Sequence, residues 1–317
     1  MVVEPSGGSR PEFRDLDSFC KTEIAPWLKA HEGRQRSARR LRWLIIGTGF
    51  AALAAGCYYL LRQPAGTHEV WFLGLLAGAV AVVKLGNLPH WRLRTDVRTF
   101  VMSKLAGFFD FTYQEHAAID EIELFRDLKL LPPDTSVDFG GGLQGVIESI
   151  PFQMVEIHLT ERHATGRSSD TMTVFRGLLL SMPCNAAGII TVRRRGDVAW
   201  SDGEEQGAAA LGDAAFHENY VVHESEPGAA GHVLGAAARR LFTKLDSLDG
   251  VGNVRLGIRS GRLLLVIERS IASFEDGRLD SSLADPDRTQ ALVALFVIPF
   301  DAVDAFRWQP ASAPAAS

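Results

Sequence analysis

The sequence predicts a membrane protein in which a two-helix transmembrane hairpin precedes a cytoplasmic α+β domain with mainly antiparallel strands. One observation behind this prediction is the run "WLIIGTGFAALAAGCYYLL", residues 43–61, which has nineteen residues and no charge. A helix of that length, at about 1.5 Å per residue, crosses a hydrocarbon core of ~30 Å. The other observation is a change of pattern after Pro132 and Pro133, where short β-branched segments are divided by turn-forming stretches.

The composition fits a folded chain and narrows the classes of partner. The chain has 317 residues, of which 46% are hydrophobic and 22% are charged. Its net charge of −5 gives no overall attraction to nucleic acid, which we therefore do not expect as a partner. The cysteines Cys20, Cys57 and Cys184 lie far apart in the sequence, which predicts neither a zinc site nor a disulfide framework. A reducing compartment fits this pattern.

A second span is predicted over residues 70–88. Its apolar run ends at Val83, and the span reaches full length if the Lys84 side chain extends to the nearer membrane surface. The external loop 62–69 is short, so the two helices should form an antiparallel hairpin. Small residues along both helices indicate either close helix packing or only a weakly hydrophobic sequence. They are Gly47, Gly49, Ala51, Ala55 and Gly56 in the first helix, and Gly74, Ala77, Gly78 and Ala81 in the second.

Basic residues set the expected orientation of the hairpin. They flank the outer ends of both spans, whereas the loop between the spans carries only Arg62. The flanking residues are Lys29, Arg34, Arg36, Arg39, Arg40 and Arg42 before the first span, and Lys84, Arg92, Arg94 and Arg98 within or after the second. We therefore predict a multi-pass protein of the bacterial inner membrane with both termini in the cytoplasm. The four arginines Arg36, Arg39, Arg40 and Arg42 either only set this topology or form a dedicated lipid-recognition site.

The rest of the chain divides into tails, a lead-in and one large domain. The lead-in before the first span is expected to be amphipathic, basic and helical, and both tails are expected to be disordered because they are rich in Pro, Ser and small residues. The predicted boundaries are 1–11 for the first tail, 12–42 for the lead-in, 89–308 for the cytoplasmic α+β domain and 309–317 for the last tail.

The first half of the α+β domain is predicted to pass from helix to strand. A helix should follow a break at Pro89, and "AIDEIELFRDLKLL" reads as a short amphipathic helix that Pro132 and Pro133 stop. An antiparallel meander should follow. Its expected strands are "GVIESIPFQMVEIHLTER", "TMTVFRGLLLSM" and "IITVRR".

The second half of the domain is expected to alternate between the two types of element. A loop over roughly 196–215 leads to a strand "NYVVHE" and then to a helix that opens at Glu226 and Pro227. Two strands should meet in a hairpin around Ser260 and Gly261. The last helix should begin at Asp285-Pro286 and be divided by Pro299.

A glycine pattern, Gly140-x-Gly142-x-x-Gly145, has the spacing of a nucleotide-binding loop. Such a loop needs a helix after the glycines, because the free N–H groups at the start of that helix hold the phosphate. Here the β-branched and apolar pattern after Gly145 predicts a strand instead. We therefore expect a flexible turn that leads into a hairpin, and we expect no cofactor.

The order of these parts and several local phrases resemble the bacterial membrane proteins of the domain of unknown function 3137 family. The resembling phrases are "FCKTEIAPWLKAHEGRQR", "ELFRDLKLLP", "GVIESIPFQMVEIHLTER", "TVFRGLLL", "NYVVHES" and "GRLLLVIE". The likeness covers roughly Phe13 to Phe274. It implies the same architecture of membrane hairpin and soluble domain, and it supplies no catalytic or binding residue.

Two groups of side chains are candidates for chemistry. Glu156 and His158 should share one face of a strand, and with a third ligand they could hold zinc. His217 and His223 could likewise face one way, although a straight strand would separate them by about 20 Å. Exposed strand residues of these types are common, so the plain alternative is that none of the four binds a metal. No G-x-S-x-G motif places a catalytic serine.

A second basic group, Arg193, Arg194 and Arg195, ends a predicted strand. It is either a solvated strand end or a contact for anionic lipid or an acidic partner. We therefore predict a tethered domain that acts as a binding module for a lipid surface or for another membrane or cytoplasmic protein, in preference to an enzyme. The alternative is a membrane-anchored hydrolase or metal-dependent enzyme built around Glu156, His158 and the 217–224 segment.

Overall fold

The computed structural model describes residues 10–61, 68–165, 168–186, 188–197, 209, 211–270 and 286–306. The chain divides into two compact units. An α+β unit comprises residues 1–14, 102–277 and 287–317, and a helical unit comprises 15–101 and 278–286. Both predicted tails, the loop 62–69 and the loop 196–215 lie largely or wholly outside the described residues.

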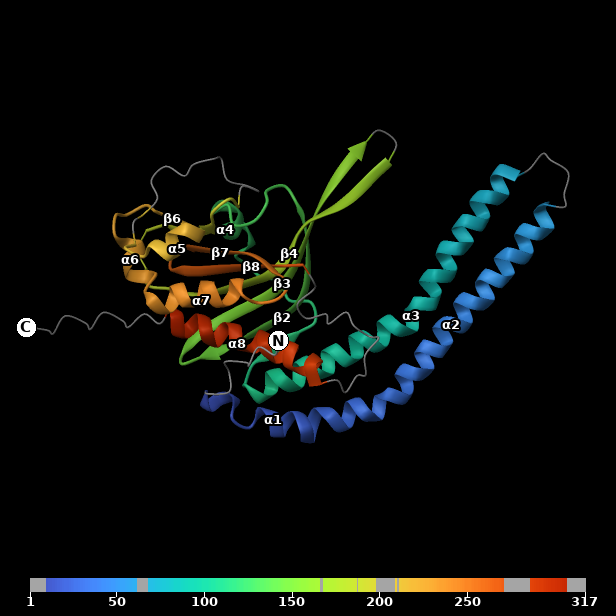
Figure 1. The fold of residues 1–317 in the computed structure, drawn as a ribbon, viewed down its shortest axis with the longest axis horizontal. Helices are drawn as coiled ribbons and strands as arrows, with labels where there is room; N and C mark the ends of the chain where they lie inside the picture. The colour runs from blue at the N-terminus through green and yellow to red at the C-terminus, as the bar shows by residue number, and fades with distance from the viewer. Residues whose placement is uncertain are drawn as a thin grey trace, which may run out of the picture. The chain divides into compact units, whose positions relative to one another are not determined.

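The core of the α+β unit is an eight-stranded antiparallel sheet with strand order β1-β2-β3-β4-β8-β7-β5-β6 (Figure 1). The predicted meander is confirmed where β3 pairs with β4, but β4 then pairs with β8 rather than with β5, and β2 was not predicted as a separate strand. The strands are β1 Thr112–Gln114, β2 Ser136–Ile147, β3 Ile150–Thr165, β4 Ser168–Pro183, β5 Ile190–Arg194, β6 Tyr220–Glu224, β7 Val251–Arg259 and β8 Arg262–Arg269. The predicted α+β class with mainly antiparallel strands is therefore confirmed.

Both faces of the sheet are covered. The helices of this unit are α4 Ile122–Asp127, α5 Ala214–Asn219, α6 Ala229–Val233, α7 Ala236–Asp246 and α8 Pro286–Ala305. On one face, Phe242 of α7 packs against Tyr220 of β6, and Phe300 of α8 packs against Phe111. On the other face, Leu128 and Leu130 beyond α4 lie over β7, where a side chain at Gly257 would collide with them. Strands buried on both sides read as nearly continuous apolar runs, as β8 does.

The helical unit contains two long helices in one hairpin. The chain enters it through α1 Leu16–Phe19 and a π-helical turn, Cys20–Ile24, before α2 Ala25–Leu61. The second helix, α3 His68–Phe108, runs back and ends in the α+β unit. The predicted break at Pro89 is wrong, because α3 continues through it. A proline removes one backbone hydrogen bond, which a helix of this length tolerates.

The last helix also differs from its prediction. It begins at Pro286 as predicted, but Pro299 does not divide it. Phe296 and Phe300, on either side of the proline, are buried in the core. Their burial offsets the lost hydrogen bond and holds the helix together. The predicted single helix after Glu226 and Pro227 is instead split into α6 and α7 at Gly235, whose backbone is extended.

The glycine pattern lies inside strand β2 and forms no turn. The glycines permit close approach, because a side chain at Gly142 would collide with Ala117, and one at Gly145 with Phe111. The actual turn comes later, at Glu148 and Ser149, both of which have positive φ. A two-residue turn of this hand matches the twist of an antiparallel pair.

The start of the described chain is part of the α+β unit. Arg10 forms ion pairs with Asp301 at 2.6 Å and with Asp304 at 2.8 Å. The ring of Phe13 lies 4.8 Å from that of Phe109 and 5.4 Å from that of Phe300. The chain then passes into the helical unit after Arg14 and returns to the α+β unit at Met102.

The Glu148-Ser149 turn supports a stability prediction. Ser149 has φ 71°, a conformation that glycine adopts without steric cost. We expect Ser149→Gly to raise the free energy of unfolding by about 0.5–1 kcal/mol. The matched control is Ser247→Gly, because Ser247 has an ordinary φ of −81° and the change there should be destabilising. Thermal unfolding of the full chain in detergent, followed by circular dichroism, measures both, and a loss of stability in Ser149→Gly would contradict the account.

Candidate functional site

Helices α2 and α3 approach each other through glycines. A side chain at Gly49 would collide with Val82, and one at Gly78 would come within 3.1 Å of Leu53. A side chain at Gly47 or Gly74, by contrast, would meet no other part of the protein within 4 Å, so these two glycines lie outside this contact. The close-packing interpretation of the small residues therefore holds for Gly49 and Gly78.

The outward faces of the two helices expose large apolar side chains. Trp43 is 67% exposed, Phe50 is 47% exposed and Leu76 on α3 is 56% exposed. The others among the described residues of these helices are Leu41, Leu44, Tyr58, Val80 and Val83. Among the described residues, one helical segment, Arg40–Tyr58, is long and apolar enough to cross a membrane, and none of it is buried. In the predicted second span, the apolar segment Gly74–Lys84 is shorter.

The basic flank of α2 is largely solvent-exposed. Arg36 forms an ion pair with Glu32 one turn earlier, at 3.3 Å, and Arg40 is exposed. Arg42 is half-buried, and the side chain of Arg39 lies outside the described part. Exposed ion pairs of this kind contribute little to stability, so these side chains can reorient toward anionic groups.

The second basic group does not form one patch. Successive residues of β5 point to opposite faces, so Arg193 and Arg194 diverge. Arg195 follows the strand and donates a hydrogen bond to the carbonyl oxygen of His217 at 3.0 Å. The predicted contact surface at Arg193, Arg194 and Arg195 is therefore divided, and one of its members supports the neighbouring helix.

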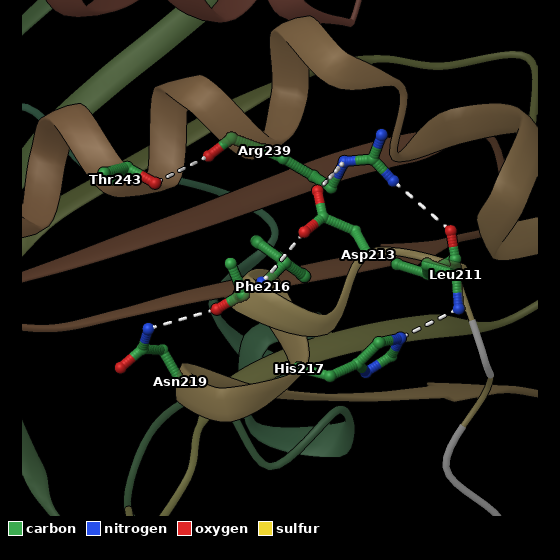
Figure 2. Close-up of polar contacts among 8 residues, drawn as sticks. Leu211, Asp213, Phe216, His217, Asn219, Arg239 and Thr243 are labelled. Atoms are coloured by element: carbon green, nitrogen blue, oxygen red, sulfur yellow. Dashed lines mark hydrogen bonds and ion pairs between the residues drawn. The ribbon is translucent and has the colours of Figure 1, made fainter.

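A polar network holds the segment around α5 against α7 (Figure 2). Asp213 accepts a hydrogen bond from the Phe216 N–H at 3.2 Å and forms an ion pair with Nε of Arg239 at 3.1 Å. The Leu211 N–H donates to Nε2 of His217 at 2.8 Å. Since Nε2 is the acceptor, it is not available to a metal. His217 lies in α5 and His223 in β6, so the prediction that both share one strand is wrong.

Glu156 and His158 lie on β3 with the same parity, so they share a face as predicted. Glu156 is buried, and His158 contacts the Thr173 hydroxyl through Nε2 at 2.8 Å. Burial and the neighbouring Arg176 lower the pKa of His158, while Asp138 raises it. The described residues contain no cluster of His, Cys, Asp and Glu that could hold a metal.

Sequence reasoning missed a buried ion-pair network on β7. Arg255 is 1% exposed and binds Asp197 through Nε at 2.6 Å and through Nη2 at 3.1 Å. Its Nη2 also donates to Glu268 at 3.0 Å, and its guanidinium lies 5.8 Å from the centre of the Phe175 ring. The available signal was an arginine inside the apolar run "NVRLGI". The network attaches the end of β5 to the middle of the sheet.

Cys20 allows a test of the helical unit that needs no ligand. Burial and the carboxylate of Asp17 raise the pKa of its thiol to about 11. At pH 8 we therefore expect maleimide to react about a hundredfold more slowly with Cys20 than with an ordinary thiol. The rate should rise about tenfold per pH unit until pH approaches that pKa. An exposed Ser103→Cys variant is the control, and equal rates at pH 8 would refute the expected burial of Cys20.

Comparisons with known proteins establish no family for this chain. No family model matches it, and no curated protein matches it. The resemblance to the domain of unknown function 3137 family therefore stays a prediction. Among solved structures, the mycobacterial trehalose monomycolate transport factor A, TtfA, is similar over 68% of this chain and 98% of its own, with 12% identity and a TM-score of 0.31.

Proposed function

We propose that α2 and α3 insert together into the bacterial inner membrane and tether the α+β unit in the cytoplasm, where it binds a membrane-associated partner or a lipid surface. The observation that supports this is the exposed apolar surface on both helices. Several large apolar side chains exposed on one pair of helices are unfavourable in water and mark a membrane or protein contact. Burial of these side chains in lipid removes that cost.

The polar groups of the first span are compatible with lipid. The Thr48 hydroxyl donates to the Leu44 carbonyl oxygen at 2.6 Å. A hydroxyl in hydrocarbon must find such a partner within the protein, because no water is present. Lys84 is exposed near the end of the predicted second span, 70–88, where a long side chain can reach the headgroups.

The register of the hairpin supports a common orientation of the two basic segments. Gly49 lies level with Val82, and Leu53 with Gly78, so the helices are antiparallel with a constant offset. Extending this offset puts Arg92 of α3 level with Arg39 of α2. Basic residues of both helices therefore gather at one end of the hairpin, and such an excess faces the cytoplasm.

Tethering to the membrane favours a binding function for the α+β unit. Confinement near the bilayer raises its effective concentration toward other membrane components, so a weak contact suffices. Within the described residues, no observation favours the hydrolase or metal-dependent alternative.

Alkaline carbonate extraction of membranes from cells that make the full chain tests the proposal. We expect the protein to stay in the membrane pellet and to enter solution only with detergent. Release by carbonate alone would overturn insertion of the hairpin. A peripheral protein that binds headgroups through its basic residues would be released, so the result separates spanning from surface adhesion.

A further inference from the structure

Three basic side chains lie in one row across neighbouring strands, and Asp138 of β2 ends the row, where it pairs directly with His158. His158 of β3 pairs directly with Arg176 of β4. Gly177 pairs with Glu268 of β8, so Arg176 and Arg269 come next to each other one step further along these antiparallel strands. Residues placed in this way have Cα atoms about 5 Å apart.

The three side chains also share a face. The neighbouring row toward the core contains Glu156, Leu178 and Ile267, which pair with one another in that order. Directly opposed residues on adjacent strands point to the same face of the sheet. His158, Arg176 and Arg269 each lie two residues from a member of that row, so they point to the same side. The inner row is buried, whereas the basic row is half-buried.

The two arginines lack the partners that buried arginines normally have. Among the described residues, neither forms an ion pair, and the buried Nε of Arg269 has no hydrogen bond. Burial lowers the pKa of Arg269, and only the Glu156 carboxylate acts in the opposite direction. Like charges placed side by side on adjacent strands are destabilising. The guanidinium groups of Arg176 and Arg269 therefore repel each other at a half-buried site.

We propose that Arg176 and Arg269 form a binding site for the phosphate group of a ligand, with His158 as a third hydrogen-bonding group. Guanidinium groups bind phosphate oxygens through paired N–H donors, and two of them from different strands can hold one phosphate group. Asp138 beside His158 and Glu156 behind the row are both acidic, so the phosphate is held by the paired guanidinium N–H donors rather than by a net positive charge. A phosphodiester headgroup and a soluble phosphate ester share this chemistry.

The test is thermal unfolding of the full chain in detergent, in inorganic phosphate and in chloride at equal ionic strength. We expect phosphate to raise the unfolding temperature above its value in chloride and Arg176→Gln to weaken the apparent phosphate affinity at least fivefold. Arg240→Gln, on the exposed side of α7, should behave as the wild type. In chloride, Arg176→Gln should unfold at the same or a higher temperature, because the repulsion is gone.

A merely structural arginine would give the opposite result in chloride, namely a lower unfolding temperature for Arg176→Gln. That result, or equal stabilisation of wild type and variant by phosphate, or no stabilisation of the wild type, would overturn the site. Mixed micelles then identify the source. If phosphatidylglycerol micelles displace phosphate and phosphatidylcholine micelles do not, the ligand is an anionic lipid. Displacement by both indicates a phosphodiester headgroup of either type, and displacement by neither indicates a soluble ester. The site does not depend on the location of α2 and α3, so it and the membrane proposal fail separately.

Discussion

Replacing Arg255 by alanine is expected to lower the free energy of unfolding by about 3–5 kcal/mol. Arg255 is almost fully buried and holds Asp197, whose side chain is 3% exposed. Removal of the arginine leaves that carboxylate buried without its partner, and the cost of an uncompensated buried charge is large. Glu268 is 32% exposed, so water can compensate it.

Two variants separate the charge from the packing of Arg255. Arg240→Ala removes an arginine from the exposed side of α7 and should change stability by less than about 0.5 kcal/mol. The double variant Arg255→Met with Asp197→Asn should be more stable than Arg255→Ala, because it removes both charges and keeps most of the volume. Urea unfolding of the full chain in detergent measures all three. A cost below about 1 kcal/mol for Arg255→Ala would show that water reaches this pair.

Introducing an arginine at Phe50 is expected to impair membrane insertion. Phe50 lies on the outward face of α2 near the middle of the segment Arg40–Tyr58. An arginine at the centre of a span costs about 2.5–3.5 kcal/mol, which corresponds to roughly a hundredfold change in the insertion equilibrium. The fraction of Phe50→Arg that carbonate releases from membranes should therefore rise markedly.

The matched control is Trp43→Arg. Trp43 is also exposed, but it lies next to the basic flank at the end of the same segment. A charged group there reaches the headgroups and costs little. Equal release of the two variants would contradict the predicted depth of Phe50 in the bilayer.

Local pattern predicted most of the strands, because alternation and turn chemistry act over a few residues. The hairpin at Ser260 and Gly261 is formed as predicted, with both residues at positive φ. The turn at Glu148 and Ser149 was missed because neither residue is the glycine or asparagine that such a turn favours. The pairing of β4 with β8 was also missed, because local pattern carries no information about which distant strand becomes a neighbour.

In the candidate site, too, the sequence predicted the local features and missed those that depend on distant parts of the chain. The prediction that Glu156 and His158 share a face follows from the strand period alone, and the register agrees with it. The sequence could not predict that Arg176 and Arg269 follow His158 in one row. Their placement depends on the strand order, which brings distant parts of the chain together. The helix around His217 opens at Asp213, an N-cap residue that the sequence displayed and that the strand interpretation passed over.

Thiol labelling in intact cells tests the membrane topology most directly. In a cysteine-free background, Ala65→Cys places a thiol in the segment between α2 and α3, and Thr171→Cys places one at an exposed position of β4. If the hairpin spans the membrane and the α+β unit is cytoplasmic, a membrane-impermeant maleimide labels Ala65→Cys in intact cells and labels Thr171→Cys only after the inner membrane is permeabilised. Labelling of Thr171→Cys in intact cells would contradict a cytoplasmic α+β unit held by a transmembrane hairpin.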